Sequence, residues 1–205
     1  MVRVKVRELG VVGAFEFTPP VHGDDRGLFV SPFLTSAFEE TLDRVLFPVR
    51  QMSYSVSQRG VVRGVHYTTT PPGAAKYVTC PHGTVLDVIV DLRRGSPTFG
   101  EWDSLVLDWK QPRGVYFPTG VGHMFVALAD DSVVAYSLST EYIATNEQSV
   151  SVLDPELKLP IPDDIEPMLS PRDTTADTLA EALAKGSLPD YETCLALDEG
   201  RLERS

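Results

Sequence analysis

Residues 85–93, VLDVIVDLR, form a β-strand pattern with two unlike faces. Successive side chains point to opposite faces of a strand. Four apolar side chains share one face: Leu86, Val88, Val90 and Leu92. The other face alternates Val85 and Ile89 with Asp87 and Asp91. Either the aspartates lie in solvent outside a sandwich, or this mixed face lines the interior of a barrel that holds a ligand.

The rest of the chain supports an all-β domain. Short β-type runs separated by Gly, Pro and Asp-rich turns fill residues 2–153, which is typical of a sandwich or barrel. We expect strands over residues 13–17, 27–33, 49–57, 61–67, 75–79, 84–92, 102–107, 113–117, 123–127 and 132–139. One helix is predicted over residues 35–42, where Phe38 and Leu42 are four positions apart.

The pattern of short β-type runs ends at about residue 154. Four prolines between residues 155 and 167 predict an extended segment across the body, and a helix is expected near residues 175–185. Leu179 and Leu183 give that helix an apolar stripe, and Gly186 fits its end. We therefore predict a single domain over residues 1–205, with its core at about 13–153 and residues 154–205 packing on it.

Composition excludes several classes of protein. The net charge of −11 argues against binding to a nucleic-acid polymer, although a small anionic ligand needs only two or three converging cations. No apolar run approaches the roughly 18 residues of a membrane span. The first residues, MVRVKVRELGVVGAF, do not resemble a signal peptide, so the cytoplasm is the expected compartment. Cys80 and Cys194 are expected to be free thiols.

Residues 59–78, RGVVRGVHYTTTPPGAAKYV, hold three polar side chains that could form a pocket: Arg63, His66 and Lys76. Arg63 and His66 are three positions apart and would face opposite sides of a regular strand. We therefore expect Gly64 to mark a bulge. TTTPPG is a tight connection that could bring the next strand back alongside the first. A single histidine on a strand is often only structural, so these residues leave its role open.

Residues 117–125, FPTGVGHMF, contain the P-x-G-x-x-H spacing of the second cupin motif, which ends at His123. In a metal cupin the earlier motif supplies His-x-His, but here it reads HYT from His66. A metal site with three histidines would have to recruit His22 or His82. The sequence therefore favours a cupin without a metal, which leaves His66 for acid/base chemistry, ligand binding or packing.

Several runs in order resemble the signatures of the dTDP-4-dehydrorhamnose 3,5-epimerase family, in particular its actinomycete branch, which makes unusual deoxysugars of antibiotics. They are QMSYSVSQRGVVRGVHY (51–67), AAKYV (74–78), DVIVDLRRGSPTFGEW (87–102), PTGVGHMF (118–125) and LSPRD (169–173). The resemblance extends from about residue 16 to 189. It implies a metal-free, cofactor-independent cupin jelly roll, usually a homodimer. The implied reaction inverts C5, C3 or both of a dTDP-linked 4-keto-6-deoxyhexose.

The resemblance also implies catalytic roles. His66 corresponds to the base, Asp173 to the carboxylate that orients it, and Tyr136 to the acid on the opposite face of the sugar. Lys76 corresponds to the cation near the keto oxygen, and Asp87 becomes an interior residue near this cluster. These residue types suit the chemistry, because a proton next to a ketone is a weak acid and its removal requires stabilisation of the enolate.

The resemblance assigns a further set of residues to substrate binding: Arg26, Phe29, Gln51, Ser53, Arg63, His123, Tyr142, Glu147 and Arg172. Arg26 and Arg63 would contact the diphosphate or nucleotide, and Arg26 and Phe29 would reach the ligand of the neighbouring subunit.

Some of these positions stay open. Tyr142 could merely pack, Glu147 could lie on the surface, and Asp91 with Arg93 could be a structural ion pair. The chain also departs from the family pattern in three places: Ser53 replaces an Asn, Ser31 a Glu and Arg172 a Lys.

Three other functions are less consistent with the sequence. A 3,4-ketoisomerase acting on the same kind of substrate is disfavoured by SPTFGEW and LSPRD. A non-catalytic nucleotide-sugar-binding cupin is disfavoured by intact His66, Tyr136 and Asp173. A metal-dependent cupin oxygenase is disfavoured by the missing second histidine.

Overall fold

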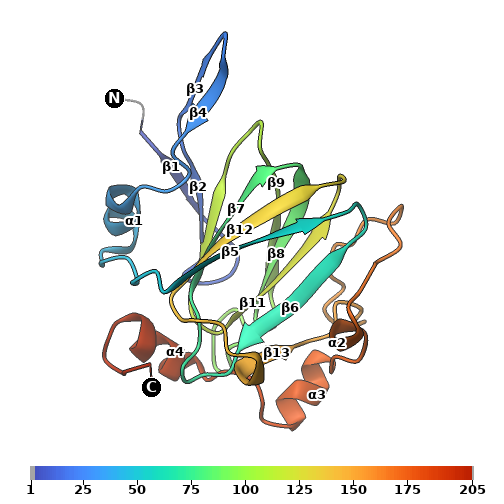
Figure 1. Ribbon diagram of the computed structural model, residues 1–205. Helices are drawn as coiled ribbons and strands as arrows, with labels where there is room; N and C mark the ends of the chain where they lie inside the picture. The colour runs from blue at the N-terminus through green and yellow to red at the C-terminus, as the bar shows by residue number, and fades with distance from the viewer. Residues whose placement is uncertain (1–2, 205) are drawn as a thin grey trace.

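The computed structural model describes residues 3–204 as two antiparallel β-sheets packed face to face, with a projecting hairpin and short helices (Figure 1). The first sheet has the order β1 (Lys5–Glu8), β2 (Phe15–Thr18), β10 (Gly114–Phe117), β7 (Lys76–His82), β12 (Ser132–Leu138) and β5 (Gln51–Ser57). The second has the order β13 (Glu147–Ser149), β6 (Val62–Thr68), β11 (Val121–Ala127), β8 (Thr84–Asp91) and β9 (Trp102–Asp108). The hairpin consists of β3 (Val21–Asp24) and β4 (Gly27–Val30).

Strand β8 settles which face of the second sheet is inside. Val85 and Ile89, on its mixed face, pack with Val115 and Val134 of the opposite sheet. Asp87 shares that face and is completely buried. The aspartates of this strand therefore point into the interior, as one of the two sequence interpretations predicted.

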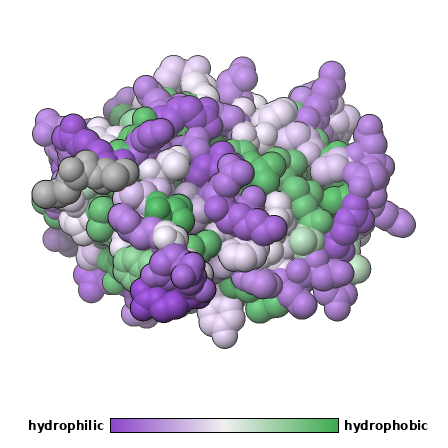
Figure 2. Space-filling model, turned by 90° about the horizontal axis from the view of Figure 1, so that it is seen from above, coloured by the Kyte–Doolittle hydropathy of each residue, from purple (hydrophilic) through white to green (hydrophobic). Residues whose placement is uncertain are grey.

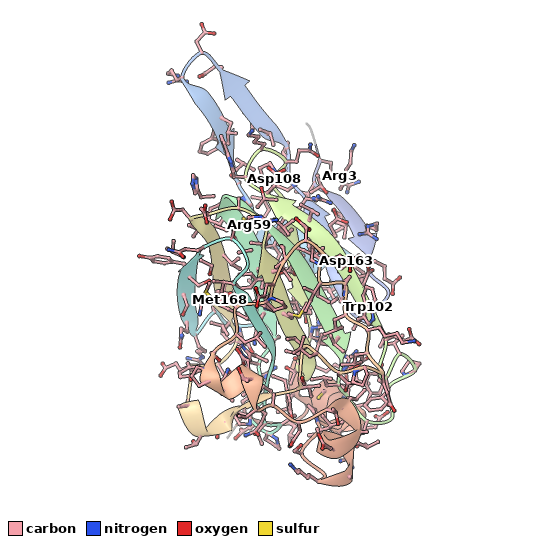
Figure 3. All side chains as sticks on the ribbon, turned by 90° about the vertical axis from the view of Figure 1, so that its right-hand side faces the viewer. Arg3, Arg59, Trp102, Asp108, Asp163 and Met168 are labelled. Atoms are coloured by element: carbon pink, nitrogen blue, oxygen red, sulfur yellow. The ribbon has the colours of Figure 1, made fainter. Side chains whose placement is uncertain are left out.

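The fully apolar face of β8 points away from the first sheet. Val88 and Val90 pack there against Val152 and against Leu157 and Ile165 of the C-terminal segment, which follows residue 154. The indole nitrogen of Trp102 on β9 also donates to the Leu157 carbonyl at 2.9 Å, and Figure 3 shows Trp102 on this side of the molecule. The segment after residue 154 thus replaces solvent over the outer face of the sheet, and its burial stabilises the fold.

Residues 3–204 contain five short helical elements: α1 (Thr35–Leu42), η1 (Ala144–Asn146), α2 (Pro171–Thr174), α3 (Leu179–Ala184) and α4 (Tyr191–Asp198). The predicted helix over residues 35–42 is confirmed as α1. Its Phe38 packs edge to face on Tyr116, with ring centroids 4.8 Å apart. Within residues 3–204, no helix is long and apolar enough to cross a membrane.

The helix predicted near residues 175–185 begins later than expected. Asp177 forms a β-bridge with Val150, and its carbonyl accepts a hydrogen bond from Ser151 N at 2.7 Å, so the chain is still extended there. Helix α3 starts after Thr178, which forms a capping box with Glu181. Helices α2 and α4 and strands β1, β3 and β13 were not predicted, and each has at most eight residues.

The predicted all-β jelly-roll class with few short helices is confirmed, although the two sheets stay separate and do not close into one barrel. The strands on either side of TTTPPG, β6 and β7, do not pair with each other, although the sequence allowed such a pairing. Strand β6 lies in the second sheet and β7 in the first, so the connection crosses from one sheet to the other. As a result His66 and Lys76 project from facing sheets and not from one hairpin.

Candidate active site

A cavity of about 190 Å³ is lined by strands of both sheets and by the segment that follows β12. The structure brings most of the predicted site residues into its wall: Gln51, Ser53, Arg63, His66, Lys76, His123, Tyr136, Tyr142, Glu147 and Arg172. Thr140 and Glu141 also line it and were not predicted. They lie in the loop after β12, where Thr140 continues the alternation of Tyr136 and Leu138 but Glu141 does not.

A bulge at Gly64 places Arg63 and His66 on the same cavity. In the pairing of β6 with β11, His66 is opposite His123, but Arg63 is opposite Phe125. Three steps along β6 thus match two along β11, which gives the strand one extra residue. Gly64 has φ of +141°, and a Cβ there would lie 2.5 Å from the Met124 Cα. The predicted bulge is confirmed, and only glycine fits it.

His66 is held by a carboxylate from a distant part of the chain. Its Nε2 lies 2.7 Å from the Asp173 Oδ1, and the Asp173 Oδ2 accepts a hydrogen bond from the Ser170 hydroxyl at 2.8 Å. Ser170 caps helix α2 and so fixes the carboxylate. Although burial opposes ionisation of Asp173, its hydrogen bonds from His66 and Ser170 hold its pKa below the usual value.

The ionised Asp173 can only accept a hydrogen bond from His66. The ring proton of His66 is therefore on Nε2, and Nδ1 keeps its lone pair. Burial lowers the pKa of His66, while Asp173 acts in the opposite direction. His66 is therefore neutral at pH 7, with Nδ1 available as a base.

A second histidine–carboxylate pair lies beside the first. The Nε2 atom of His123 is 2.6 Å from the Asp87 Oδ1, and the His123 ring stacks on Phe117 with centroids 5.0 Å apart. Asp87 Oδ2 is buried and has no hydrogen-bond partner in residues 3–204. Asp87 thus acts on the cavity through His123, which lines the wall, and it does not line the wall itself.

Lys76 projects from the first sheet into the cavity, opposite His66. It is 7% exposed, and no ion pair or side-chain hydrogen bond within residues 3–204 involves its ammonium group. Burial lowers its pKa, whereas the charge of Glu147 raises it. Glu147 itself accepts a hydrogen bond from the Thr68 hydroxyl at 2.8 Å. A buried ammonium group without a bonded partner is suited to bind an oxygen that gains negative charge.

Tyr136 lies on the same face of the first sheet as Lys76. Lys76 pairs with Leu138, two residues from Tyr136 on β12. The Tyr136 ring meets His123 edge to face, with centroids 5.9 Å apart, and its hydroxyl lies 3.5 Å from the Ser55 hydroxyl. Burial raises the pKa of Tyr136, so the phenol keeps its proton at neutral pH.

Tyr142 and Glu147, left open by the sequence, both line the cavity. Strand β12 ends at Leu138, so Tyr142 lies on the following loop, where its backbone N–H donates to Gln51 Oε1 at 2.7 Å. By contrast, Asp91 and Arg93 form a buried ion pair at 2.7 Å, and neither lines this cavity. For that pair the structural interpretation holds.

Arg26 and Phe29 do not reach the cavity of their own chain. Both lie on the β3–β4 hairpin, which stands clear of the sheets (Figures 1 and 3). Phe29 is 68% exposed, and Arg26 forms an ion pair with Asp24. They can serve a binding site only if that site belongs to another chain.

No group of three His, Cys, Asp or Glu side chains within residues 3–204 is placed to hold a metal ion. His66 and His123 lie on neighbouring strands, but each is bonded to a separate carboxylate. Both cysteines are free thiols in the structure, as predicted, and burial raises their pKa, to about 11 for Cys80 and about 12 for Cys194.

Comparison with known proteins gives close relatives over nearly the whole chain. The family model described as dTDP-4-dehydrorhamnose 3,5-epimerase matches residues 8–181. The chain is 47% identical to a dTDP-4-dehydrorhamnose 3,5-epimerase of Mycolicibacterium smegmatis, over 94% of both chains. It is also 46% identical to a dTDP-4-dehydrorhamnose 3-epimerase of Streptomyces niveus, over 95% of this chain and 93% of the relative.

Solved structures agree. The structure superposes with a TM-score of 0.90 on NovW, a 4-keto-6-deoxy sugar epimerase of the novobiocin cluster of Streptomyces spheroides, at 45% identity over 94% of this chain and 96% of NovW. With ChmJ, a 3'-monoepimerase from Streptomyces bikiniensis in complex with dTDP-quinovose, the TM-score is 0.89 at 43% identity over 94% of this chain and 96% of ChmJ.

Proposed function

The chain belongs to the dTDP-4-dehydrorhamnose 3,5-epimerase family, and from that premise we propose that it inverts C3, C5 or both of a dTDP-linked 4-keto-6-deoxyhexose in deoxysugar biosynthesis. One observation carries the proposal for the site. A base, His66, projects from one sheet into the cavity, and Lys76 and Tyr136 project into it from the facing sheet. A sugar ring between the sheets would meet a base on one face and a proton donor on the other.

The first step is removal of a proton from the carbon next to the C4 ketone. Nδ1 of His66 accepts the proton. The electron pair of the C–H bond forms a C=C bond to C4, and the π pair of the C4 ketone moves to its oxygen, which gives an enolate. Asp173 stabilises the imidazolium that forms, through its 2.7 Å hydrogen bond to Nε2. The ammonium group of Lys76 stabilises the enolate oxygen, and its effect is strong because the site is buried.

Inversion requires a proton to return from the other face of the ring. Tyr136 donates it from its hydroxyl, and the electron pair of the enolate forms the new C–H bond. The phenolate then regains a proton from solvent, and His66 loses its proton to solvent. Because burial keeps Tyr136 protonated, it can act as the acid at neutral pH.

The remaining cavity residues fit the dTDP group. Arg63 and Arg172 line the cavity, and both reach solvent, so they can bind a diphosphate at its mouth. Tyr142 is 57% exposed and offers a ring on which a base can stack. These cations are conspicuous in a protein with a net charge of −11.

We also propose that the chain works as a homodimer. Strand β5 is an edge strand, and its outward side chains Met52, Tyr54 and Val56 are 77%, 74% and 53% exposed. Exposed apolar edge strands pair readily with another chain. Figure 2 views the molecule from the end with the hairpin and shows hydrophobic patches among hydrophilic ones there.

In the dimer, Arg26 and Phe29 would contact the substrate in the partner's cavity. Sedimentation at micromolar concentration tests this, and a monomer would contradict it.

The test of the reaction is proton exchange with solvent. Pure, chelator-treated protein incubated in D2O with the dTDP-4-keto-6-deoxyhexose should introduce deuterium at C3, C5 or both, as followed by proton NMR. The labelled positions identify the carbon that is inverted. His66→Ala is the control and should lose the exchange. Absence of deuterium at both carbons with the wild-type protein would contradict the proposed function.

A further inference from the structure

Strand β5 carries polar side chains on its inner face and apolar ones on its outer face, although it is the edge of a sheet. The inner positions are Gln51, Ser53, Ser55 and Ser57. Ser57 is 3% exposed, whereas the neighbouring Val56 is 53% exposed. A row of small hydroxyls on a strand that faces the core is unfavourable unless each hydroxyl has a partner.

The inner side chains of β5 bond residues of the proposed site. Gln51 Nε2 donates to Ser53 at 2.8 Å, and Ser57 accepts from Arg63 Nε at 3.2 Å. Ser55 lies 3.5 Å from the Tyr136 hydroxyl. The inner face of β5 is therefore a support for side chains that line the cavity, and Ser55 supports the proposed acid.

The register of the strands explains why Ser55 reaches Tyr136. Tyr136 is directly opposite Ser53, and Ser55 is opposite Val134, so Ser55 is the diagonal neighbour of Tyr136 on the same face. A tyrosine is long enough to bridge this diagonal. His123 contacts the ring from another side, and within residues 3–204 Ser55 is the one side chain bonded to the Tyr136 hydroxyl.

We propose that Ser55 is a positioning residue that holds the Tyr136 hydroxyl where it donates a proton to the enolate, and so sets the ratio of inversion to simple proton exchange. This inference rests on the proposed function. Ser55 is not in the wall of the cavity, so it acts through Tyr136 and does not contact the sugar.

The ratio depends on two competing fates of the enolate. If the His66 imidazolium first exchanges its proton with D2O, the enolate can take a deuteron back from His66 on the original face, which gives deuterated substrate of unchanged configuration. Alternatively, Tyr136 delivers a deuteron to the opposite face, which gives the inverted product. Displacement of the Tyr136 hydroxyl slows only the second fate, because proton removal by His66 does not involve Ser55.

Ser55→Ala removes the hydroxyl and leaves the strand and the ring in place. We expect the rate of inversion to fall about 3- to 10-fold, as for loss of one neutral hydrogen bond, with little change in KM. The amount of deuterated but uninverted substrate per inverted product should rise by the same factor. Ser55→Thr keeps the hydroxyl, suits a β-strand and should restore the wild-type ratio.

Ser57→Ala is the matched control on the same face of β5. It removes the partner of Arg63, so it should raise KM and leave the ratio of exchange to inversion unchanged. A general loosening of β5 would instead slow exchange and inversion together in both variants.

The outcomes are distinct. If Ser55→Ala has the same ratio of exchange to inversion as the wild type, the inference is overturned while the proposed function stands. Failure of Ser55→Thr to restore the wild-type ratio overturns the inference in the same way. An equal rise of the ratio in Ser57→Ala overturns it as well. If the wild-type protein takes up no deuterium, the proposed function fails first, and the inference fails with it.

Discussion

The Nε2 atom of His66 and the Oδ1 atom of Asp173 are 2.7 Å apart although 107 positions of the chain separate them. His66 lies on β6, and Asp173 lies on the short helix α2. The C-terminal segment, after it covers the outer face of the second sheet, thus returns to orient the proposed base. Packing of that segment and catalysis are linked for this reason.

Asp173→Asn should reduce kcat/KM by about 10²- to 10³-fold, because the imidazolium would lose the charge that stabilises it. Ser170→Ala is the milder comparison, since it keeps the charge of Asp173 and removes only the hydrogen bonds of the Ser170 hydroxyl with the Asp173 carboxylate and backbone N–H. It should reduce kcat/KM about 3- to 10-fold. Steady-state kinetics on the dTDP-4-keto-6-deoxyhexose measure both. Equal rates for Asp173→Asn and wild type would contradict the role of the carboxylate.

In a plot against pH, kcat/KM should fall on the acid side, in a limb that lies below pH 6.5. Burial holds the pKa of His66 below its ordinary value of 6.5, and only the neutral ring is a base, so activity falls as pH drops through that lowered pKa. Asp173 raises the pKa of His66, so Asp173→Asn should shift the limb to still lower pH. A shift of the limb toward higher pH in this variant would contradict the assignment.

Gly64→Ala should destabilise the protein and reduce activity strongly. The added Cβ would lie 2.5 Å from the backbone of Met124, so the bulge that aligns Arg63 with His66 must open. We expect a loss of about 2–4 kcal/mol in the free energy of unfolding, measured by urea denaturation. Gly95→Ala is the control, since Gly95 also has positive φ but no atom within 4 Å of the added Cβ. A similar loss in both variants would argue against the clash.

Mixed dimers should test the trans contribution of the hairpin. The double variant Arg26→Ala, Phe29→Ala lacks the two hairpin side chains, called the arm below. His66→Ala lacks the base. Each variant alone should therefore be poorly active. When the two are unfolded together and refolded, a heterodimer contains one site with His66 and an intact arm. Up to about a quarter of wild-type activity should return, because half of the dimers are then mixed with one good site each. No recovery beyond the sum of the two variants would contradict an arm that acts across the dimer.

Arg93→Ala should destabilise the fold without altering the cavity. Asp91 is completely buried and is bonded by Arg93, Ser96 and Thr98, so loss of Arg93 leaves an uncompensated buried charge. Removal of one partner of a buried pair costs about 3–5 kcal/mol. The free energy of unfolding should fall by that amount, while KM of the folded fraction stays at the wild-type value. An altered KM would place Arg93 nearer to the substrate than the structure has it.

Much of the fold follows from local patterns. Alternation of side chains and the turn residues located ten strands, and the spacing of Phe38 and Leu42 located α1. Short elements such as β13 and α2 escaped prediction, because three or four residues carry too little periodicity. The start of α3 was misplaced because Asp177 pairs with Val150, a contact that no nearby residue indicates.

The candidate site divides in the same way. Residue types, their order and the Gly64 bulge could be read from the sequence, since each depends on neighbours along the chain. Ser55 could have been found too, because Gln51, Ser53 and Ser57 share its alternating polar pattern in QMSYSVS. The contact of Ser55 with Tyr136, however, depends on the register of β5 with β12.

By itself the sequence determined an all-β chain with a histidine, a lysine, a tyrosine and two aspartates in a recognisable order. Only the tertiary structure decided that the mixed face of β8 is inside, that β7 crosses to the facing sheet, and that Arg26 and Phe29 lie outside their own cavity. The physical reason is that alternation tells which side chains share a face, whereas burial depends on what packs against that face. Here the outer face of β8 is covered by residues more than sixty positions further along the chain, such as Val152 and Leu157.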